Sequence, residues 1–432
     1  MIRALLSVAL CFAILITDLM AKNIDGGPVP VAIEYNEQAD RYQVHRDDEP
    51  YFIKGVGGAR DLEKLASMGA NSVRTWSTSD AGEILDEAYE HGLTVMLGIW
   101  LEHERHGFDY DDEEAVQAQK EEVREKILRY KDHPALLAWG LGNEVDLMYQ
   151  NTRVWHAVED IAQMVKELDP NHLITTVTAG IDEEKAVLIQ EKVPSIDFLS
   201  VNTYADLPEL PNTIREIGWD KPYVVTEWGP TGHWESPTTE WDVPIEETSS
   251  EKAEVYYHRY KTAIEEDREM CLGSYAFLWG QKQETTPTWY GMFLENDYLT
   301  EVADVMQYLW SGEWPESRAP SIDQFTIEGM KAIDNIYLES GEIFEAKVVA
   351  SHPQNNTAFQ IEWEFLPEST DIGAGGDSEE RPETMYSLSQ EESDEGILKF
   401  MAPEESGPYR LFVYILHENN KAATANIPFY VQ

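Results

Sequence analysis

The chain has 432 residues, and its 32 basic side chains (Lys and Arg) against 81 acidic ones (Asp and Glu) give a formal net charge of −49. This charge excludes nucleic acids and anionic membranes as partners, because a phosphate-rich surface would repel the chain. Hydrophobic residues make up 42% of the chain and aromatic residues 11%, enough to fill a large core, which excludes a disordered chain. The only two cysteines, Cys11 and Cys271, exclude a disulfide framework.

Residues 1–21 have the pattern of a secretory signal peptide. Arg3 supplies a positive charge, residues 4–16 are apolar, and Ala21 is a small residue suited to cleavage. We therefore expect a secreted or periplasmic protein, with Cys271 left without a disulfide-linked partner. An uncleaved N-terminal membrane anchor is the alternative, because Leu19 is an imperfect residue at the −3 position of the cleavage site.

Short apolar runs alternate with helical patterns from residue 51 to residue 310. Each run is hydrophobic on both faces, as is typical of buried parallel strands. The predicted strands are residues 51–55, 71–76, 93–100, 135–141, 173–177, 198–202, 223–226 and 272–279. The predicted helices are residues 61–68, 81–91, 113–130, 154–168, 251–265 and 301–310, and a hairpin at residues 31–35 and 42–45 precedes the first strand.

Eight strands alternating with helices predict a (β/α)₈ TIM barrel, whose usual length is about 250 residues. A doubly wound open sheet is the runner-up, but neither G-x-G-x-x-G nor a P-loop follows an early strand. We assign residues 22–312 to the barrel with its N-terminal β-hairpin. Residues 313–322 are rich in Pro, Ser and charge and are assigned to a linker.

Residues 323–432 are assigned to a second, smaller domain. Alternating apolar runs predict strands at residues 344–349, 359–365, 398–401, 409–415 and 425–430. Their spacing is typical of a small antiparallel β-sandwich, immunoglobulin-like in character. The fold class is therefore α/β, a TIM barrel followed by a C-terminal β-sandwich. The sandwich either binds polysaccharide or packs against the barrel.

Two glutamates mark the candidate active site, since the active site of such a barrel lies at the carboxyl ends of its strands. Glu144 follows the fourth strand and Glu227 follows the seventh, so both are expected to face one cleft. Paired carboxylates cleave glycosidic bonds: one protonates the leaving oxygen, and the other attacks the anomeric carbon or activates water. A single glutamate is most often a surface charge, so the prediction depends on the pair. This chemistry needs no cofactor.

The motifs Gly142-Asn143-Glu144 and Thr226-Glu227-Trp228-Gly229 resemble those of glycoside hydrolase clan A. The likeness covers roughly residues 50–312 and is closest to the TIM-barrel catalytic domains of family 2. It implies that Glu144 is the acid/base and Glu227 the nucleophile of a retaining double displacement.

Four further roles follow from the resemblance alone. It implies that Asn143 binds the sugar 2-hydroxyl, that Arg74 supports the nucleophile, and that Tyr204 lies near it. It also implies that Trp279 is the platform under the reacting sugar. The jelly-roll and sandwich domains that precede the barrel in large family 2 enzymes are missing from the sequence. Their exo-acting specificities are therefore not transferred.

Other residues are predicted to line the substrate site because they end a strand or follow one. These residues are Trp76, His103, His106, Asn202, Trp228, His233 and Trp234. Aromatic faces stack on the apolar faces of pyranose rings, although some of these side chains could instead belong to the core. Physical reasoning agrees with the two catalytic roles. Arg74 near Glu227 would keep it ionised, whereas Trp139 and apolar neighbours would help Glu144 to hold its proton.

Residues 102–106, with His103 and His106 three positions apart, have some likeness to a metal site. The ligand patterns of established sites are absent in form, so no metal is predicted. A contribution of this loop to the sugar cleft is the favoured interpretation. The acidic residues at 109–114 are expected to be a solvated helix start.

The leading functional hypothesis is a secreted retaining β-glycoside hydrolase that acts on a β-linked poly- or oligosaccharide. A neutral glucan is favoured, because an anionic cleft would repel uronate-rich chains. A transglycosylase with the same residues is one alternative, since a sugar hydroxyl can replace water. A non-catalytic carbohydrate-binding barrel and a metal-dependent barrel hydrolase are the others. A monomer or a weak oligomer is expected.

Overall fold

The computed structural model describes residues 26–355, 359–390 and 396–432. The predicted signal peptide lies outside the described residues. Among the helices of the described ranges, none combines the length and the apolar character that crossing a membrane requires. Cys271 is a buried free thiol.

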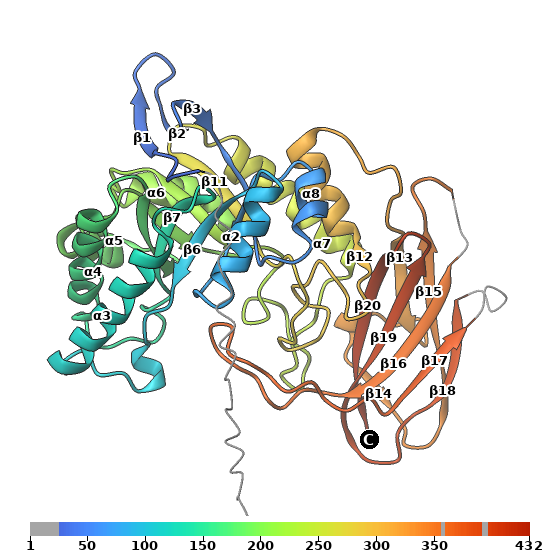
Figure 1. The fold of residues 1–432 in the computed structure, drawn as a ribbon. Coiled ribbons are helices and arrows are strands. Elements are labelled where there is room, and N and C mark those ends of the chain that lie inside the picture. Colours follow the sequence, from blue (N-terminus) through green and yellow to red (C-terminus); the bar gives the residue numbers. More distant parts are fainter. Residues whose placement is uncertain (1–25, 356–358, 391–395) are drawn as a thin grey trace, which may run out of the picture.

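A closed barrel of eight parallel strands forms the larger part of the molecule, which confirms the predicted (β/α)₈ fold (Figure 1). Around the barrel the strand order is β10, β11, β4, β5, β6, β7, β8, β9. The strands are β4 Ile53–Gly57, β5 Ser72–Arg74, β6 Thr94–Ile99, β7 Leu136–Asn143, β8 Leu173–Ala179, β9 Leu199–Asn202, β10 Tyr223–Trp228 and β11 Cys271–Ala276. All eight overlap the predicted apolar runs.

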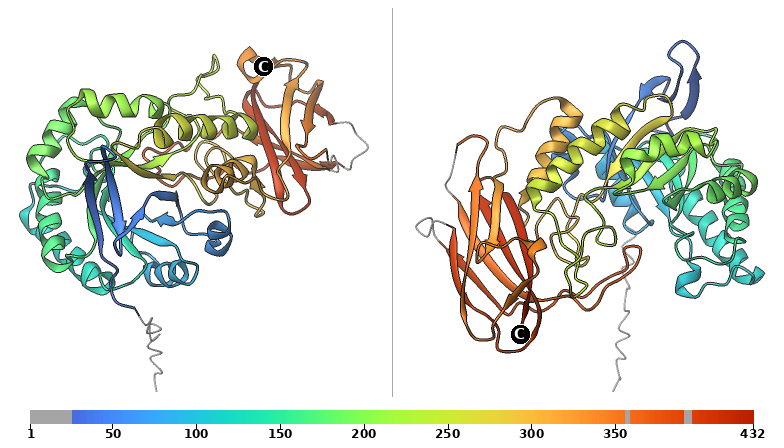
Figure 2. Two further views of the ribbon diagram at one scale, coloured as in Figure 1. Left: turned by 90° about the horizontal axis from the view of Figure 1, so that it is seen from above. Right: turned by 180° about the vertical axis from the view of Figure 1, so that it is seen from behind.

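Helices follow the strands and surround the barrel (Figure 2). They are α1 Leu62–Ser67, α2 Ala81–Glu90, α3 Glu113–Tyr130, α4 Val154–Leu168, α5 Glu183–Lys192, α6 Leu210–Glu216, α7 Ser249–Arg259 and α8 Glu301–Ser311. A π-helical segment, η3 Tyr260–Glu265, continues α7, and the 3₁₀ turns η1 Glu104–His106 and η2 Leu207–Glu209 lie in loops. Helices α5 and α6 were not predicted.

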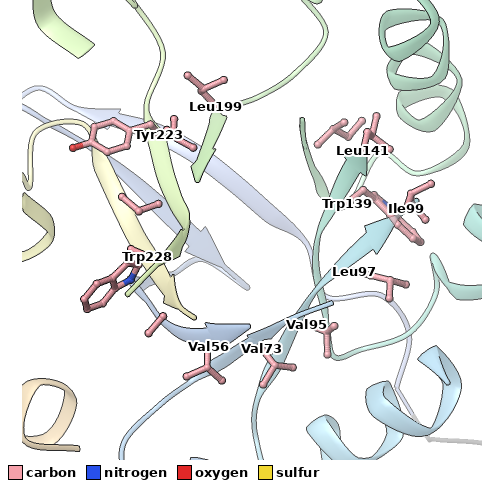
Figure 3. Close-up of a cluster of buried hydrophobic side chains, with 14 of the residues drawn as sticks. Val56, Val73, Val95, Leu97, Ile99, Trp139, Leu141, Leu199, Tyr223 and Trp228 are labelled. Carbon is pink, nitrogen blue, oxygen red and sulfur yellow. The ribbon is translucent and has the colours of Figure 1, made fainter. Parts of the chain in front are cut away.

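Outward-facing side chains of the strands fill the layer between the barrel and its helices. Val56, Val73 and Val95 point away from the barrel interior, as do the rings of Trp139 and Trp228 (Figure 3). β-branched and aromatic residues suit strands that are buried on both faces. Because this layer is apolar, the strands are held rigidly and their carboxyl ends present side chains in fixed positions.

A small antiparallel sheet covers the amino-terminal end of the barrel. It consists of β1 Val31–Asn36, β2 Arg41–Arg46 and β3 Glu49–Tyr51, the first two being the predicted hairpin. Val31 and Val44 pack in one cluster with Leu173, Leu272 and other residues at or near the amino-terminal ends of barrel strands. This end of the barrel is therefore sealed by apolar contacts.

The C-terminal domain contains two facing sheets, as predicted. Strands β14, β16, β17, β19 and β20 belong to one sheet, and β13, β15 and β18 form the other. The strands are β13 Ser321–Ile327, β14 Ile336–Leu338, β15 Ile343–Ser351, β16 Gln360–Pro367, β17 Tyr386–Gln390, β18 Ile397–Met401, β19 Gly407–His417 and β20 Lys421–Val431, with a 3₁₀ turn η4 Ala332–Asp334. Buried residues such as Trp363, Phe365 and Leu411 form its core.

The barrel and the sandwich are joined by backbone pairing. Strand β12 (Leu299–Thr300), which precedes α8, pairs in parallel with β20 at Lys421 and Ala422. The Lys421 ammonium group contacts the buried Asp304 carboxylate of α8. The sandwich therefore packs against the barrel.

The stretch predicted as a linker, residues 313–322, is exposed at 313, 314 and 316 and buried at 319, 320 and 322. The amide of Ala319 donates a hydrogen bond of 2.6 Å to Asp304. Ser321 and Ile322 are already the first residues of β13, and the Ile322 amide bonds Ser250 on α7 at 2.9 Å.

Candidate active site

Glu144 and Glu227 stand at the carboxyl ends of β7 and β10, each just after a break in strand register. The pairing of β7 with β8 shifts between Leu141 and Asn143, and that of β10 with β9 shifts between Val225 and Glu227. A β-bulge turns the following side chain relative to regular alternation, and bulges are common beside active sites. The bulges therefore aim both glutamates at the barrel mouth.

A continuous chain of hydrogen bonds joins the two glutamates. Asn202 Nδ2 donates to Glu144 Oε1 at 2.8 Å and to Asn143 Oδ1 at 3.3 Å. Arg74 Nη2 donates to the same Asn143 oxygen at 2.5 Å, and Arg74 Nη1 donates to Glu227 Oε1 at 2.7 Å. Strands β5, β7, β9 and β10 each contribute one or more of these side chains, so the barrel itself sets their spacing.

Glu227 is 7% exposed and accepts hydrogen bonds at both carboxylate oxygens. Besides Arg74, Trp76 Nε1 donates to Oε1 at 2.7 Å, and the Tyr204 hydroxyl donates to Oε2 at 3.2 Å. Hydrogen bonds from a guanidinium, an indole and a phenol hold both oxygens of the Glu227 carboxylate in fixed positions. This arrangement fits a carboxylate that acts as a nucleophile.

Glu144 lies in the opposite electrostatic situation. Burial and the negative charge of Glu227 raise the pKa of Glu144 to about 8, although Asn202 donates to it. A carboxyl group with such a pKa holds a proton at neutral pH and can deliver it. Glu144 itself has a left-handed backbone (φ 51°), and Gly142, two residues before it, has φ 72°. A Cβ at Gly142 would lie 2.8 Å from Val145, so only glycine fits this turn.

An aromatic cluster borders Glu227, and part of it was not predicted. Phe277 lies edge-on to Trp76 with ring centroids 5.9 Å apart, and it contacts Tyr204 and Tyr290. Phe277 follows β11 and lies among the rings beside Glu227, where the family resemblance had placed Trp279. The apolar run at residues 272–279 predicted the strand, but the resemblance assigned the sugar platform to Trp279 and not to Phe277.

His233 and Trp234 lie in the loop after β10, on the same side as Tyr204. The Trp234 ring is edge-on to Tyr204 at 5.4 Å and is 58% exposed, so a face is free for a ligand. His233 packs edge-on against Trp234 and Trp289. Burial and the nearby Lys282 lower the pKa of His233. Both predicted residues are therefore near the glutamate pair.

Two predicted substrate residues are wrong. Trp228 is fully buried in the layer between the barrel and its helices, with Tyr256 and Tyr260 as ring neighbours (Figure 3). Successive side chains of a strand point to opposite faces, so an inward Glu227 places Trp228 outward. Trp279 is 1% exposed, packs on Phe293, and its indole donates to the Arg60 carbonyl. Neither ring can support a sugar.

His103 and His106 lie in the loop after β6 and form a ring stack with Trp100. The centroids are 4.7 Å apart for Trp100 and His103, and 5.2 Å for His103 and His106. Burial and the charge of Arg105 lower the pKa of His103 to about 4. His106 hydrogen-bonds Asp377 of the C-terminal domain at 3.2 Å. Within the described ranges, no group of three or more His, Cys, Asp or Glu side chains is arranged to hold a metal ion.

Comparison with known families identifies one match within the barrel. Residues 53–234 match the model described as "Glycosyl hydrolases family 2, TIM barrel domain". The matched region runs from β4 through the loop that contains Trp234, and so includes both glutamates. It agrees with the clan A resemblance of the two motifs.

Curated relatives are distant and cover parts of the chain. A putative mannan endo-1,4-beta-mannosidase 9 of Oryza sativa subsp. japonica is 24% identical over 208 residues, which are 34% of this chain and 51% of that protein. A beta-galactosidase of Bacteroides ovatus is 23% identical over 317 residues, 60% of this chain and 36% of that protein. The chain thus spans about half or less of the length of these relatives.

Solved structures show the same fold. A Bacteroides uniformis beta-glucuronidase 2, a calcium-binding mutant, superposes with a TM-score of 0.53 and 13% sequence identity, covering 93% of this chain and 48% of that one. A beta-D-glucuronidase of Dictyoglomus thermophilum gives 0.52 and 19%, covering 67% of this chain and 54% of that one.

Proposed function

Because residues 53–234 match the family model described as "Glycosyl hydrolases family 2, TIM barrel domain", we propose that the chain is a retaining β-glycoside hydrolase. Glu227 is the proposed nucleophile and Glu144 the proposed acid/base. The observation that carries the proposal is the hydrogen-bonded chain from Glu144 through Asn202, Asn143 and Arg74 to Glu227.

The first step forms a glycosyl ester. A Glu227 oxygen attacks the anomeric carbon, the bond from that carbon to the leaving oxygen breaks, and its electron pair goes to the leaving oxygen. Glu144, whose pKa is raised to about 8, gives its proton to that oxygen. Arg74, Trp76 and Tyr204 hold the attacking carboxylate in place before the reaction, which lowers the entropic cost of the step.

The second step hydrolyses the ester. Glu227 is now a neutral ester, so its negative charge no longer opposes ionisation of Glu144. Glu144, which gave up its proton in the first step, takes a proton from water as the water oxygen attacks the anomeric carbon. The bond from the sugar to Glu227 breaks, and the electron pair returns to Glu227. Two inversions at one carbon give net retention of configuration.

A β-linked poly- or oligosaccharide of neutral sugars is the proposed substrate class. Arg74, Arg105 and Lys282, the cationic side chains described around the mouth, pair with Glu227, Asp377 and Glu284 respectively. Their charges are thus already compensated within the protein, which disfavours a uronate as the sugar in the site. Trp234 offers an exposed aromatic face for a pyranose ring.

Export remains part of the proposal and rests on residues 1–21 of the sequence. Amino-terminal sequencing of the protein recovered outside the cytoplasm should give a chain that begins after Ala21. Recovery of a chain that still begins at Met1 in the membrane fraction would support the uncleaved anchor instead.

The function is tested by the stereochemistry of the first product. Aryl β-glycosides of glucose, mannose, galactose and xylose are incubated with the protein, and the anomer released first is read by proton NMR. The β-anomer is expected. An α-anomer would contradict the double displacement, and absence of hydrolysis across this panel and across β-glucan, mannan, xylan and galactan would contradict the function itself.

A further inference from the structure

A long segment of the C-terminal domain reaches the mouth of the barrel. It lies between β16 and β17, and its residues 371–379 are called the strap below. The ribbon leaves the sandwich, runs toward the barrel and returns (Figures 1 and 2). At its base the Glu380 amide donates to Asp371 Oδ2 at 2.7 Å, which closes the two ends of the strap together.

The loop after β6 holds one side of the strap. Arg105 donates from Nη1 to Asp377 Oδ2 at 2.6 Å and from Nη2 to Oδ1 at 3.1 Å, a two-pronged ion pair. Arg105 also donates to the Ala374 carbonyl at 3.1 Å, and His106 bonds Asp377. The Arg105 side chain is 8% exposed and that of Asp377 39%, so the pair is buried on the arginine side, and its two-pronged geometry fixes the position of Asp377.

The loop after β11 holds the other side. Lys282 Nζ donates to the Gly376 carbonyl at 2.8 Å and to Glu284 Oε2 at 2.7 Å. The Thr285 amide donates to Glu379 Oε2 at 2.6 Å, while Glu379 Oε1 accepts from the Gly373 amide at 2.9 Å. Glu379 therefore fixes the strap to the barrel and shapes its turn at once.

The tip of the strap lies between opposite sides of the barrel mouth. A Cβ at Gly375 would be 2.4 Å from Leu147, which follows β7, and a Cβ at Gly376 would be 3.0 Å from Lys282, which follows β11. Strands β7 and β11 are four positions apart around the closed barrel, the largest separation that eight strands allow. Both glycines have positive φ, 58° and 76°, so the tight turn depends on them.

The strap is close to the reacting groups on both sides. Lys282 joins it to Glu284, whose pKa is raised by burial and in part by the charge of Glu227. Arg105 joins it to His103, whose Nδ1 accepts from Arg105 at 3.1 Å and which lies next to the Asn143 backbone. By contrast, the loop after β10 presents Trp234 with an exposed ring beside Tyr204.

We propose that the strap is a fixed wall across the substrate site, held by the loops after β6 and β11 and next to Leu147 after β7, and that it leaves the site open on the side of β9 and β10. The inference rests on the proposed function. A glycan enters past Trp234 and places one terminus against the strap, so the enzyme removes a unit of fixed size from a chain end. A chain running through the site would have to pass between Gly375 and the glutamate pair.

The test compares three variants with the wild type. In the first, residues 373–377 are replaced by two glycines, which removes the tip and keeps the Asp371 clamp. In the second, Arg105→Ala removes the two-pronged anchor without shortening the chain. The control is Arg153→Ala, because the ion pair that Arg153 forms with Asp111 at 3.0 Å is exposed and includes no residue of the strap. Substrates are hexasaccharides of β-1,4-linked glucose, mannose, xylose or galactose with a fluorescent label at the reducing end.

The wild type and Arg153→Ala should shorten the labelled chain by one fixed step at a time, or release one labelled fragment of fixed size. The first pattern means removal from the non-reducing end and the second from the reducing end. The tip replacement should give labelled fragments of several sizes from the first time point. Arg105→Ala should give a mixture of the wild-type products and the fragments of the tip replacement. Circular dichroism and hydrolysis of aryl glycosides verify that the variants fold.

Fragments of several sizes from the wild type at the earliest time, or an unchanged pattern in both strap variants, would overturn the inference and leave the proposed hydrolase intact. An inert wild type, on aryl glycosides as well as on all four hexasaccharides, would overturn the proposed function and this inference with it.

Discussion

The two ends of the barrel are both covered by chain from outside it, but by different physical means. At the amino-terminal end, Val31 and Val44 of the hairpin pack into an apolar cluster with the first residues of the strands. At the carboxyl-terminal end, the strap is held over the mouth by ion pairs and backbone hydrogen bonds. Apolar burial is non-directional and contributes mainly stability, whereas polar contacts fix positions.

The difference shows that the two ends of the barrel have separate roles: the amino-terminal end contributes stability, and the carboxyl-terminal end holds the candidate active site. Glu144 and Glu227 need unlike environments within one polar network, and such a network costs stability because charged groups are desolvated. The sealed end can offset that cost without touching the reaction. Changes at the two ends should therefore act on different measured quantities.

The largest expected effect is at the mouth, on Glu227. Glu227→Gln keeps the size of the side chain but removes the attacking charge, so kcat/KM should fall by about four to six orders of magnitude. Steady-state rates on the best aryl glycoside measure the loss. Glu125→Gln, an exposed change on α3, is the control and should leave kcat/KM unchanged. Substantial activity in Glu227→Gln would remove Glu227 from the role of nucleophile.

The next effect concerns Glu144 and pH. The wild-type kcat/KM should fall as pH rises through about 8, because Glu144 loses the proton that the leaving oxygen needs. Glu144→Gln should lower kcat by about 10²- to 10⁴-fold on substrates with poor leaving groups and abolish this alkaline limb. Dinitrophenyl glycosides, whose leaving group needs no proton, should be cleaved nearly as fast in the first step. An alkaline limb that persists in Glu144→Gln belongs to another group.

At the sealed end the effect should be on stability alone. Val44→Ala leaves a void in the hairpin cluster, and we expect the free energy of unfolding to fall by about 1–3 kcal/mol with kcat/KM unchanged. Urea denaturation measures this. Val187→Ala on α5 is the matched control, since Val187 is 45% exposed and its loss should cost less than about 0.5 kcal/mol. A drop in kcat/KM in Val44→Ala would mean that the two ends are coupled.

The smallest expected effect is at the open side of the mouth. Trp234→Ala removes a stacking face and should raise KM about 2- to 10-fold with little change in kcat, whereas Trp234→Phe should keep most of the affinity. Trp314→Ala, which removes an exposed tryptophan at the far side of α8, should leave KM unchanged. Equal KM values for all four proteins would show that the sugar does not stack on Trp234.

The barrel could be predicted from the sequence because each strand is an apolar run that is buried on both faces. Helices α5 and α6 were missed for local reasons: the apolar residues of α5 form one run at 186–189 without the spacing of a helix face, and α6 is short and carries Pro211 in its first turn. Strands β14 and β17 have three and five residues, too few for a clear alternation. Length is not the only reason, because the seven-residue β13 Ser321–Ile327, which begins in the predicted linker, was missed as well.

The residues of the candidate site also fall into those that the sequence predicts and those that it does not. The two glutamates, Arg74, Asn143, Asn202 and Tyr204 are named correctly as neighbours because each stands at a strand end, and strand ends converge. Trp228 and Trp279 failed because position along a strand does not by itself say which way a ring points. Asp377 could not have been placed at all, since it meets Arg105 across 272 residues of sequence.

The parallel pairing of β12 with β20 makes one hydrogen-bonded ladder out of residues that two domains contribute. Removing the sandwich would leave β12 with an unpaired edge and the buried Asp304 carboxylate without Lys421. The barrel and the sandwich are therefore not independent domains. The barrel, the sandwich and the strap that the sandwich carries to the barrel mouth are therefore expected to unfold together.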